Sequence, residues 1–235
     1  MSFEVINIEG KRRKISRISV DEDEIQICEV PNTKKEIQCG IIKRIILKNV
    51  FCHEHLDIEN FIPQLNLLQG ANGSGKSSVV AGIIIGLGGT CKATERGKNI
   101  SSIIKNGKNS ASIVIHLSND GYNPFQKEKY GSKIIIERKL TLSGSSSYKI
   151  KSEFGGIVSE KKEDLKKILD KFNIQVDNPA LILSQERAKT FLGSTDPKQL
   201  FKFFMTSTQL KQWSDCITEI NNDLESQKIL NSRKK

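Results

Sequence analysis

The sequence lacks an apolar run long enough to cross a membrane, because Gly or Lys interrupts the longest candidates. The N-terminus lacks the apolar core of a secretory signal. The five cysteines are scattered and odd in number, and no two are spaced as C-x-x-C. We therefore expect no membrane span and reduced thiols, as in the cytosol or nucleus.

Aromatic residues are also few, at 6%, whereas charged residues make up 27% of the 235 residues. This length allows one sizeable domain plus an appendage. The net charge is +10, and the excess lies beyond residue 40, where 30 basic side chains stand against 19 acidic ones. A basic body attracts polyanions such as nucleic acids. Solubility alone also produces such an excess, so the charge does not decide between these readings.

The dominant motif is the stretch 70–77, which fits the pattern G-x-x-x-x-G-K-[ST] at every constrained position. In such a loop, glycines let the backbone N–H groups surround an anion, the lysine reaches the outer phosphates and the serine hydroxyl binds magnesium. The helix that follows directs its positive end at the phosphates. The candidate nucleotide-binding residues are Gly70, Ala71, Asn72, Gly73, Ser74, Gly75, Lys76, Ser77 and Ser78.

The flanking sequence supports this interpretation. Leu65–Leu68 is short and apolar, which is typical of a buried parallel strand. Val79–Leu87 is apolar on every side, as expected of a helix packed on a sheet, and Gly88 and Gly89 end it. The alternative is a glycine-rich turn that binds nothing.

Ordered structure is expected to begin near Ile41, after a mobile charged arm at residues 1–38. The predicted strands are Ile41–Val50, Phe51–Phe61, Ala111–Leu117, Lys133–Leu142 and Tyr148–Lys151, the last two forming a hairpin. The run Cys52-His53-Glu54-His55 is not H-E-x-x-H, and no third ligand cluster lies near it in the sequence, which favours histidines without a metal.

The C-terminal third is predicted to be mainly helical. Ser159 is a candidate cap for a helix to Phe172, and Ala180–Leu183 is predicted to be a short strand after a turn. Asp196 and Pro197 are expected to start one last helix. Its apolar residues from 210 onward recur with the 3.5-residue period of a coiled coil, although a surface helix docked on its own domain remains open. These residues are Leu210, Trp213, Ile217, Ile220 and Leu224.

Two further segments bear on function. Residues 91–98 are predicted to be a polar, basic loop, and Arg96 within it is a candidate contact for phosphate or nucleic acid. Leu142–Ser145 resembles the start of the L-S-G-G-Q signature of ATP-binding-cassette proteins. That signature must open a helix, whereas a strand is predicted here, so we reject it.

Taken together, these motifs resemble the N-terminal head half of a structural maintenance of chromosomes (SMC) ATPase. The resemblance covers residues 41 to about 224 and is carried by the phosphate loop, Gly86–Gly89 and Leu183–Gln185. The runs at 173–179 (NIQVDNP) and 202–210 (KFFMTSTQL) resemble the paralogue of the family's DNA-repair complex more than cohesin, condensin or Rad50.

The resemblance implies an α/β P-loop NTPase fold of the ABC type, with a head lobe at 39–205 and the start of a coiled-coil helix at 206–235. It implies ATP and Mg²⁺ as cofactors. Lys76 would hold the β- and γ-phosphates, Ser77 and Gln185 would lie at the magnesium, and Arg96 would match the arginine loop linked to DNA-stimulated hydrolysis. Phe51 and Cys52 stand where many relatives have Lys-Ser.

The implied partners are a second SMC subunit through head and coiled coil, kleisin-type non-SMC subunits, DNA, and the chain's own C-terminal head half. The implied location is the nucleus, on the chromosome. The Asp-Glu pair of a Walker B strand is missing, and its nearest imitation, Ile134–Arg138, lacks the Asp. We therefore expect an N-terminal fragment or one half of a split protein, which scarcely hydrolyses ATP alone.

Two other functions remain to be weighed. One is a structural DNA-binding scaffold with a vestigial nucleotide site, which the basic body favours. The other is an unrelated P-loop enzyme such as a small kinase, for which no Asp-rich candidate is found in the sequence.

Overall fold

The computed structural model describes residues 4–7, 39–94, 99–185, 188–189, 193 and 196–232. Its centre is a six-stranded sheet of order β3-β2-β5-β6-β7-β8, in which every neighbouring pair is antiparallel. All five strands predicted in this region are confirmed, and β8 is an addition. The strands are β2 (Ile42–Val50), β3 (His53–Glu59), β5 (Ser110–Ser118), β6 (Lys133–Thr141), β7 (Ser146–Lys151) and β8 (Ile157–Ser159).

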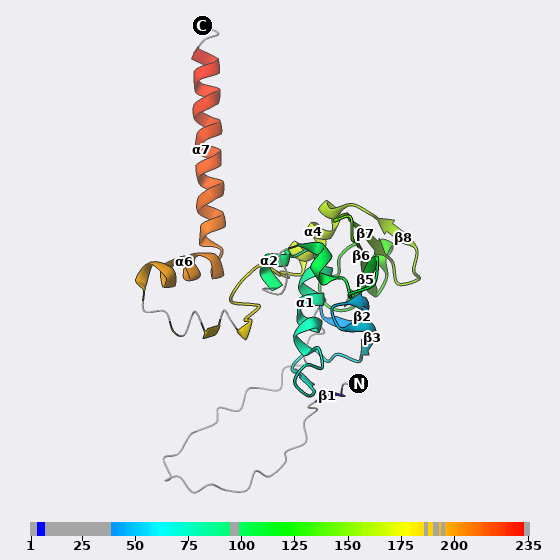
Figure 1. Ribbon diagram of the computed structural model, residues 1–235. Coiled ribbons are helices and arrows are strands. Elements are labelled where there is room, and N and C mark those ends of the chain that lie inside the picture. The colour runs from blue at the N-terminus through cyan, green and yellow to red at the C-terminus, as the bar shows by residue number, and fades with distance from the viewer. Residues whose placement is uncertain are drawn as a thin grey trace, which may run out of the picture.

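Side chains alternate across this sheet, so one face is apolar and the other polar. Helix α1 (Lys76–Gly86) packs on the apolar face, against β2, β5 and β6 (Figure 1). Helix α4 (Lys162–Lys171) adds its own apolar stripe to the same core. Fully buried members of this core include Ile45, Leu47, Ile113, Ile115, Ile134, Ile136 and Ile168.

Two glycines let α1 approach the sheet closely. A Cβ on Gly82 would lie 2.8 Å from Cδ2 of Leu47, and one on Gly86 would lie 2.6 Å from Cγ2 of Ile113. Because the two glycines are four residues apart, they lie on the same helix face. At these two positions, the helix backbone rather than a side chain lies against the sheet.

The predicted end of α1 at Gly88 and Gly89 is confirmed in detail. Gly88 takes φ +92, a conformation that glycine adopts without strain. Its N–H donates to the carbonyl of Ile85 (3.0 Å), and the N–H of Gly89 donates to that of Ile84 (2.8 Å). These two bonds form a Schellman motif, which satisfies the last carbonyls of the helix.

The strand before the phosphate loop differs from the prediction. The strand at β4 (Asn66–Gln69) is neither parallel nor fully buried: it pairs antiparallel with β1 (Glu4–Asn7) in a separate two-stranded sheet. No parallel neighbour flanks β4 in the part of the chain that the structure describes, so alternate side chains stay accessible and Leu67 is 48% exposed. Strand β1 lies in the stretch predicted to be a mobile arm; residues 1–3 and 8–38 lie outside the described residues.

Short helical turns in the described residues connect the larger elements and include α2 (Cys91–Thr94), η1 (Ile100–Ile103) and α3 (Lys127–Tyr130). The first of them corrects the prediction of a loop over 91–98, of which residues 95–98 lie outside the described residues. Ser159 does not cap α4, because the helix begins only at Lys162. Instead, its hydroxyl donates to Oδ2 of Asp164 at 2.6 Å and accepts from the N–H of Lys161.

The C-terminal part contains two helices, α6 (Pro197–Ser207) and α7 (Leu210–Ser232), where one was predicted. The predicted cap is confirmed, since Asp196 accepts from the N–H of Lys198 at 3.0 Å. The helix breaks because Gln209 takes φ +61. The predicted strand at Ala180–Leu183 is wrong: these residues form turns, in which Leu181 is 60% exposed.

Helix α7 stands away from the sheet, and α6 lies across its base (Figure 1). The apolar stripe of α7 is exposed along its length, as a coiled-coil seam without its partner would be. Among the described helices, none combines the length and the apolar character needed to span a bilayer.

Candidate phosphate-binding site

The loop Gly70–Ser77 connects β4 to α1 and folds tightly at its glycines. Gly73 and Gly75 take φ +79 and +96, a region that other residues adopt only with strain. The N–H of Ser74 donates to the carbonyl of Ala71 at 3.2 Å, which closes a turn inside the loop. Gly75 is the N-cap of α1, so the positive end of the helix dipole meets the loop.

Lys76 bends back over this loop. Its Nζ donates to the carbonyls of Gly70 and Ala71, both at 2.8 Å. The first turn of α1 holds no acidic residue, so no carboxylate offsets the ammonium or the helix end there. The electrostatics at the loop therefore favour an anion.

The serines of the motif take different positions. Ser77, the predicted magnesium ligand, is exposed on the first turn of α1. Ser74 is buried, and its hydroxyl has no hydrogen-bond partner in the described residues. Backbone N–H groups, an ammonium and hydroxyls are the donors that phosphate requires, so these residues fit the phosphates of a nucleotide. For Mg²⁺ they offer the Ser77 hydroxyl, and no cluster of three acidic, His or Cys side chains exists in the described residues.

A second segment forms part of the site and was not predicted from the sequence. The turn between β2 and β3 brings Cys52 and His53 against the loop: Nε2 of His53 lies 3.3 Å from the carbonyl oxygen of Gly75. A Cβ on Gly75 would lie 2.3 Å from that nitrogen and 2.6 Å from Sγ of Cys52. No sequence pattern predicted this contact; Phe51 and Cys52, which stand where many relatives have Lys-Ser, only marked the turn as a departure from the family.

Glu54 and His55, the other two residues of the Cys52–His55 run, have different surroundings. Glu54 forms an ion pair with Lys108, whose Nζ lies 2.7 Å from Oε1. The hydrogen bond and charge of Lys108 lower the pKa of Glu54, with a smaller effect from Lys105. His55 is exposed on β3.

One predicted site residue among the described ones lies apart from this geometry. Gln185 is exposed, and in the described residues no hydrogen bond joins it to the loop. Arg96 lies outside the described residues. The structure thus brings together Gly70–Ser78 but does not bring Gln185 to them.

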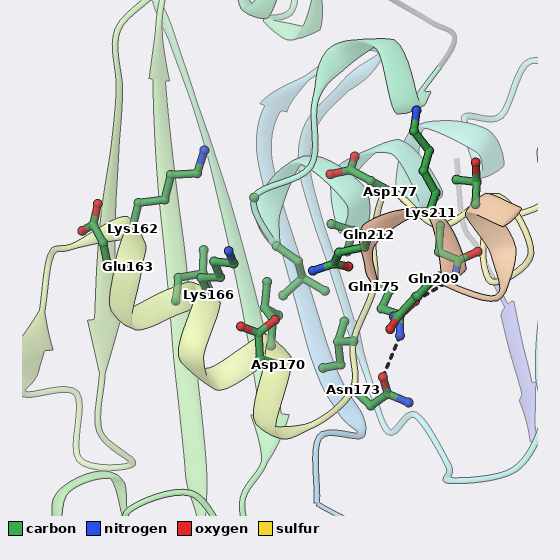
Figure 2. A pocket seen from close by; sticks show the side chains of 18 of the residues that line it. Lys162, Glu163, Lys166, Asp170, Asn173, Gln175, Asp177, Gln209, Lys211 and Gln212 are labelled. Atoms are coloured by element: carbon green, nitrogen blue, oxygen red, sulfur yellow. Dashed lines mark hydrogen bonds between the residues drawn. The ribbon is translucent and has the colours of Figure 1, made fainter. Parts of the chain in front are cut away.

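A large groove lies elsewhere, between α4 and the beginning of α7, with a volume of about 870 Å³. Figure 2 shows charged side chains of both signs around it: Lys162, Lys166 and Lys211 beside Glu163, Asp170 and Asp177. No residue of the phosphate loop lines it. The cavity is therefore separate from the phosphate site.

Comparison with known proteins defines the class of this fold and site. The family model for the AAA domain matches residues 44–235. A solved structure from work on ATP-driven dimerization and DNA-stimulated activation of SMC ATPases superposes with a TM-score of 0.57 at 21% identity, over 69% of this chain and 96% of that one. The chain is thus a P-loop NTPase domain with the fold of an SMC head.

The sequence comparison is more specific. Structural maintenance of chromosomes protein 6 of Homo sapiens is 45% identical over 195 residues, which are 83% of this chain and 18% of that protein. An Smc head domain with an extended coiled coil, bound to the C-terminal domain of ScpA from Pyrococcus furiosus, has a TM-score of 0.52 at 20% identity, over 79% of this chain and 46% of that one. The chain belongs to the structural maintenance of chromosomes family, among the relatives of protein 6. It spans less than a fifth of the length of that curated relative.

Proposed function

We propose that this chain supplies the ATP-binding part of an SMC-type head. The observation that carries the proposal is the position of Lys76, whose ammonium lies 2.8 Å from the two carbonyls at the start of the loop. A triphosphate in the loop would offer the ammonium stronger, charged acceptors than these carbonyls. Lys76 would then turn to the β- and γ-phosphates.

The other residues would act around that anion. Backbone N–H groups of 70–78 would bind phosphate oxygens, and the Ser77 hydroxyl would be a ligand of Mg²⁺, which supplies charge neutralisation at the transferred phosphoryl group. Gln185 would have to approach the loop to reach the metal and the attacking water. In the proposal, closure of a complete head brings it there.

The sequence lacks the Asp-Glu pair of a Walker B strand, which would supply the base and part of the magnesium site. In the nearest imitation of that motif, Ile134–Arg138, Glu137 pairs with Lys151 (2.7 Å), and Arg138 is buried against α1. Arg138 contacts the C-terminal end of α1, whereas the loop leads into its N-terminal end, and Glu137 is paired on the sheet. We therefore infer that turnover requires a complementary head segment, consistent with the small share of the relative's length that this chain covers.

We also propose how the chain is organised for assembly. It would consist of an arm (1–38), a head lobe (39–205) and the start of a coiled coil (206–235), in which the exposed apolar stripe of α7 would pack against a partner helix. In an Smc5–Smc6-like complex, an Smc5-like subunit, a kleisin-type subunit and DNA would be the partners. The proposed setting is DNA repair and recombination on nuclear chromosomes.

The test is ATP turnover by a completed head. The chain is combined with the matching C-terminal head segment and a partner head, and the rate is compared with that of the Lys76→Ala variant. We expect the variant to lose at least about 100-fold in turnover, because phosphoryl transfer depends on positioned charge. Equal rates would refute the assignment of the site.

A second candidate is a DNA-binding scaffold whose loop no longer serves catalysis. The basic excess and the exposed lysines Lys48, Lys139 and Lys149 on the polar face of the sheet favour it. Binding to duplex DNA is measured at several salt concentrations. A steep loss of affinity with salt, unchanged by Lys76→Ala and without ATP turnover, would favour the scaffold.

A further inference from the structure

The turn that carries His53 is held rigidly. The N–H of Phe51 donates to the carbonyl of Ile103 at 2.7 Å, and the carbonyl of Asn49 accepts from the N–H of Lys105 at 2.9 Å. These bonds fasten the end of β2 to the segment around η1. A side chain on this turn therefore has a fixed position relative to the core.

From that position, His53 reaches the last peptide of the phosphate loop. The carbonyl of Gly75 already accepts from the N–H groups of Ser78 (2.9 Å) and Val79 (3.3 Å) in the first turn of α1. Nε2 of His53 approaches the same oxygen at 3.3 Å. Because a carbonyl can only accept, the ring must carry a proton on Nε2 to form this bond.

The direction of this carbonyl determines the direction of a phosphate donor. A trans peptide is planar, so the N–H of Lys76 points opposite to the carbonyl of Gly75. A carbonyl held toward His53 therefore directs the Lys76 N–H away from the β2–β3 turn. We propose that His53 is a positioning residue of the phosphate loop, which orients the Gly75–Lys76 peptide so that its N–H faces the bound phosphate. The inference rests on the proposed function, because it concerns the same site.

The chain offers a matched control. His55 lies two residues further along β3, on the same strand face, and is exposed. Leucine at either position removes the ring nitrogens while keeping an apolar side chain. His53→Gln retains an amide donor that can reach the carbonyl.

The first test is equilibrium binding of Mg-ATP to the full chain, by titration calorimetry. We expect His53→Leu to weaken binding about three- to tenfold, the effect of one hydrogen bond, and His53→Gln to restore most of it. His55→Leu should bind as the parent chain does. If His53→Leu binds equally well while Lys76→Ala abolishes binding, the inference is wrong and the proposed function stands. If Lys76→Ala also binds equally well, the proposed function is wrong.

The second test needs no nucleotide. Two-dimensional ¹H–¹⁵N NMR of the free chain identifies the nitrogen of His53 that carries the proton and reports the Lys76 amide. We expect a proton on Nε2, and a shift of the Lys76 amide signal in His53→Leu but not in His55→Leu. A ring protonated only on Nδ1, or an unmoved Lys76 signal, would overturn the proposal. A melting temperature equal to the parent's shows that each variant is folded.

Discussion

Arg138 on β6 donates from Nη1 to the carbonyl of Ile85 at the C-terminal end of α1, at 2.6 Å. The same guanidinium lies 4.8 Å from the ring centroid of Tyr148, and the residue is 7% exposed. Burial lowers the pKa of Arg138, whereas Tyr148 and Cys91 oppose that shift. The helix end offers partial negative charge in place of a carboxylate, so this side chain joins the hairpin to the helix that carries the phosphate loop.

Removing that side chain should destabilise the fold. Arg138→Ala leaves the carbonyl of Ile85 without this partner and opens a cavity beside Tyr148, so we expect a loss of about 2–4 kcal/mol in the free energy of unfolding. Denaturant unfolding measures it. Lys139→Ala is the control, since Lys139 is exposed on the opposite face of β6, and it should change stability by less than about 0.5 kcal/mol. Equal losses of stability in the two variants would show that the hydrogen bond and packing of Arg138 do not stabilise the fold.

The two loop glycines should respond differently to a methyl group. Gly73→Ala meets nothing within 4 Å and has only the cost of its φ of +79, about 1–2 kcal/mol. Gly75→Ala has a similar φ cost and also collides with His53 and Cys52. We expect Gly75→Ala to lose Mg-ATP binding. We also expect it to lose more free energy of unfolding than Gly73→Ala. Thermal unfolding and calorimetry of both variants check this, and an equal loss in both would contradict the packing argument.

His116 should make the free energy of unfolding decrease as the pH falls. Burial, with the charges of Lys133 and Arg44, lowers the pKa of His116 to about 4 from 6.5. Between these values the unfolded chain binds the proton and the folded chain does not, so the free energy of unfolding decreases as pH falls from 6.5 towards 4. At 1.36 kcal/mol per pKa unit, the decrease from this group is about 3 kcal/mol.

The contribution of His116 is isolated by a variant that does not titrate. In His116→Asn, the decrease between pH 6.5 and 4 should be smaller by about that amount than in the parent chain. Asp57, whose pKa is lowered mainly by its hydrogen bond with Arg44, titrates in both chains, and the charge of His116 is the smallest of the causes that shift it, so its contribution changes little between them. Parallel pH curves for the two chains would contradict the assignment.

Asn119 organises the connection from β5 to β6. Its buried amide donates to the carbonyls of Phe125 (3.0 Å) and Gly131 (2.8 Å), and its Oδ1 accepts from the N–H of Phe125 (2.7 Å). Asn119→Ala leaves these groups unpaired, and we expect a loss of about 2–4 kcal/mol in denaturant unfolding. Asn109→Ala, at an exposed side chain, should stay within about 0.5 kcal/mol. A small effect of Asn119→Ala would show that water replaces the amide.

The sequence predicted the elements whose signal is local. Buried and more accessible residues alternate along most of β5 and β6, α1 is apolar from Val79 onward, and Asp196 caps α6 as the Asp-Pro pair indicated. Each depends on residues a few positions apart, so periodicity and cap chemistry were sufficient.

The wrong predictions concern features that depend on residues far apart in the sequence or on the dihedral angle of a single residue. The pairing of β4 with β1 joins residues 59 to 65 positions apart, and composition gives no register for it. The break between α6 and α7 depends on the φ of Gln209, a residue without a strong breaking tendency. In the site, the motif predicted Gly70–Ser77, but the contact of His53 with Gly75 has no sequence pattern. The positions of Gln185 and Arg96 relative to the loop stay predictions.

Gly86 lies ten residues beyond Lys76, at the end of α1 remote from the loop. Its missing side chain sets how near that end of the helix rests on Ile113 and Ile115. A bulkier residue there would push that end of the helix away from the sheet and change the angle at which α1 lies on the core. The orientation of the phosphate loop against the β2–β3 turn therefore depends partly on a glycine about three helical turns away.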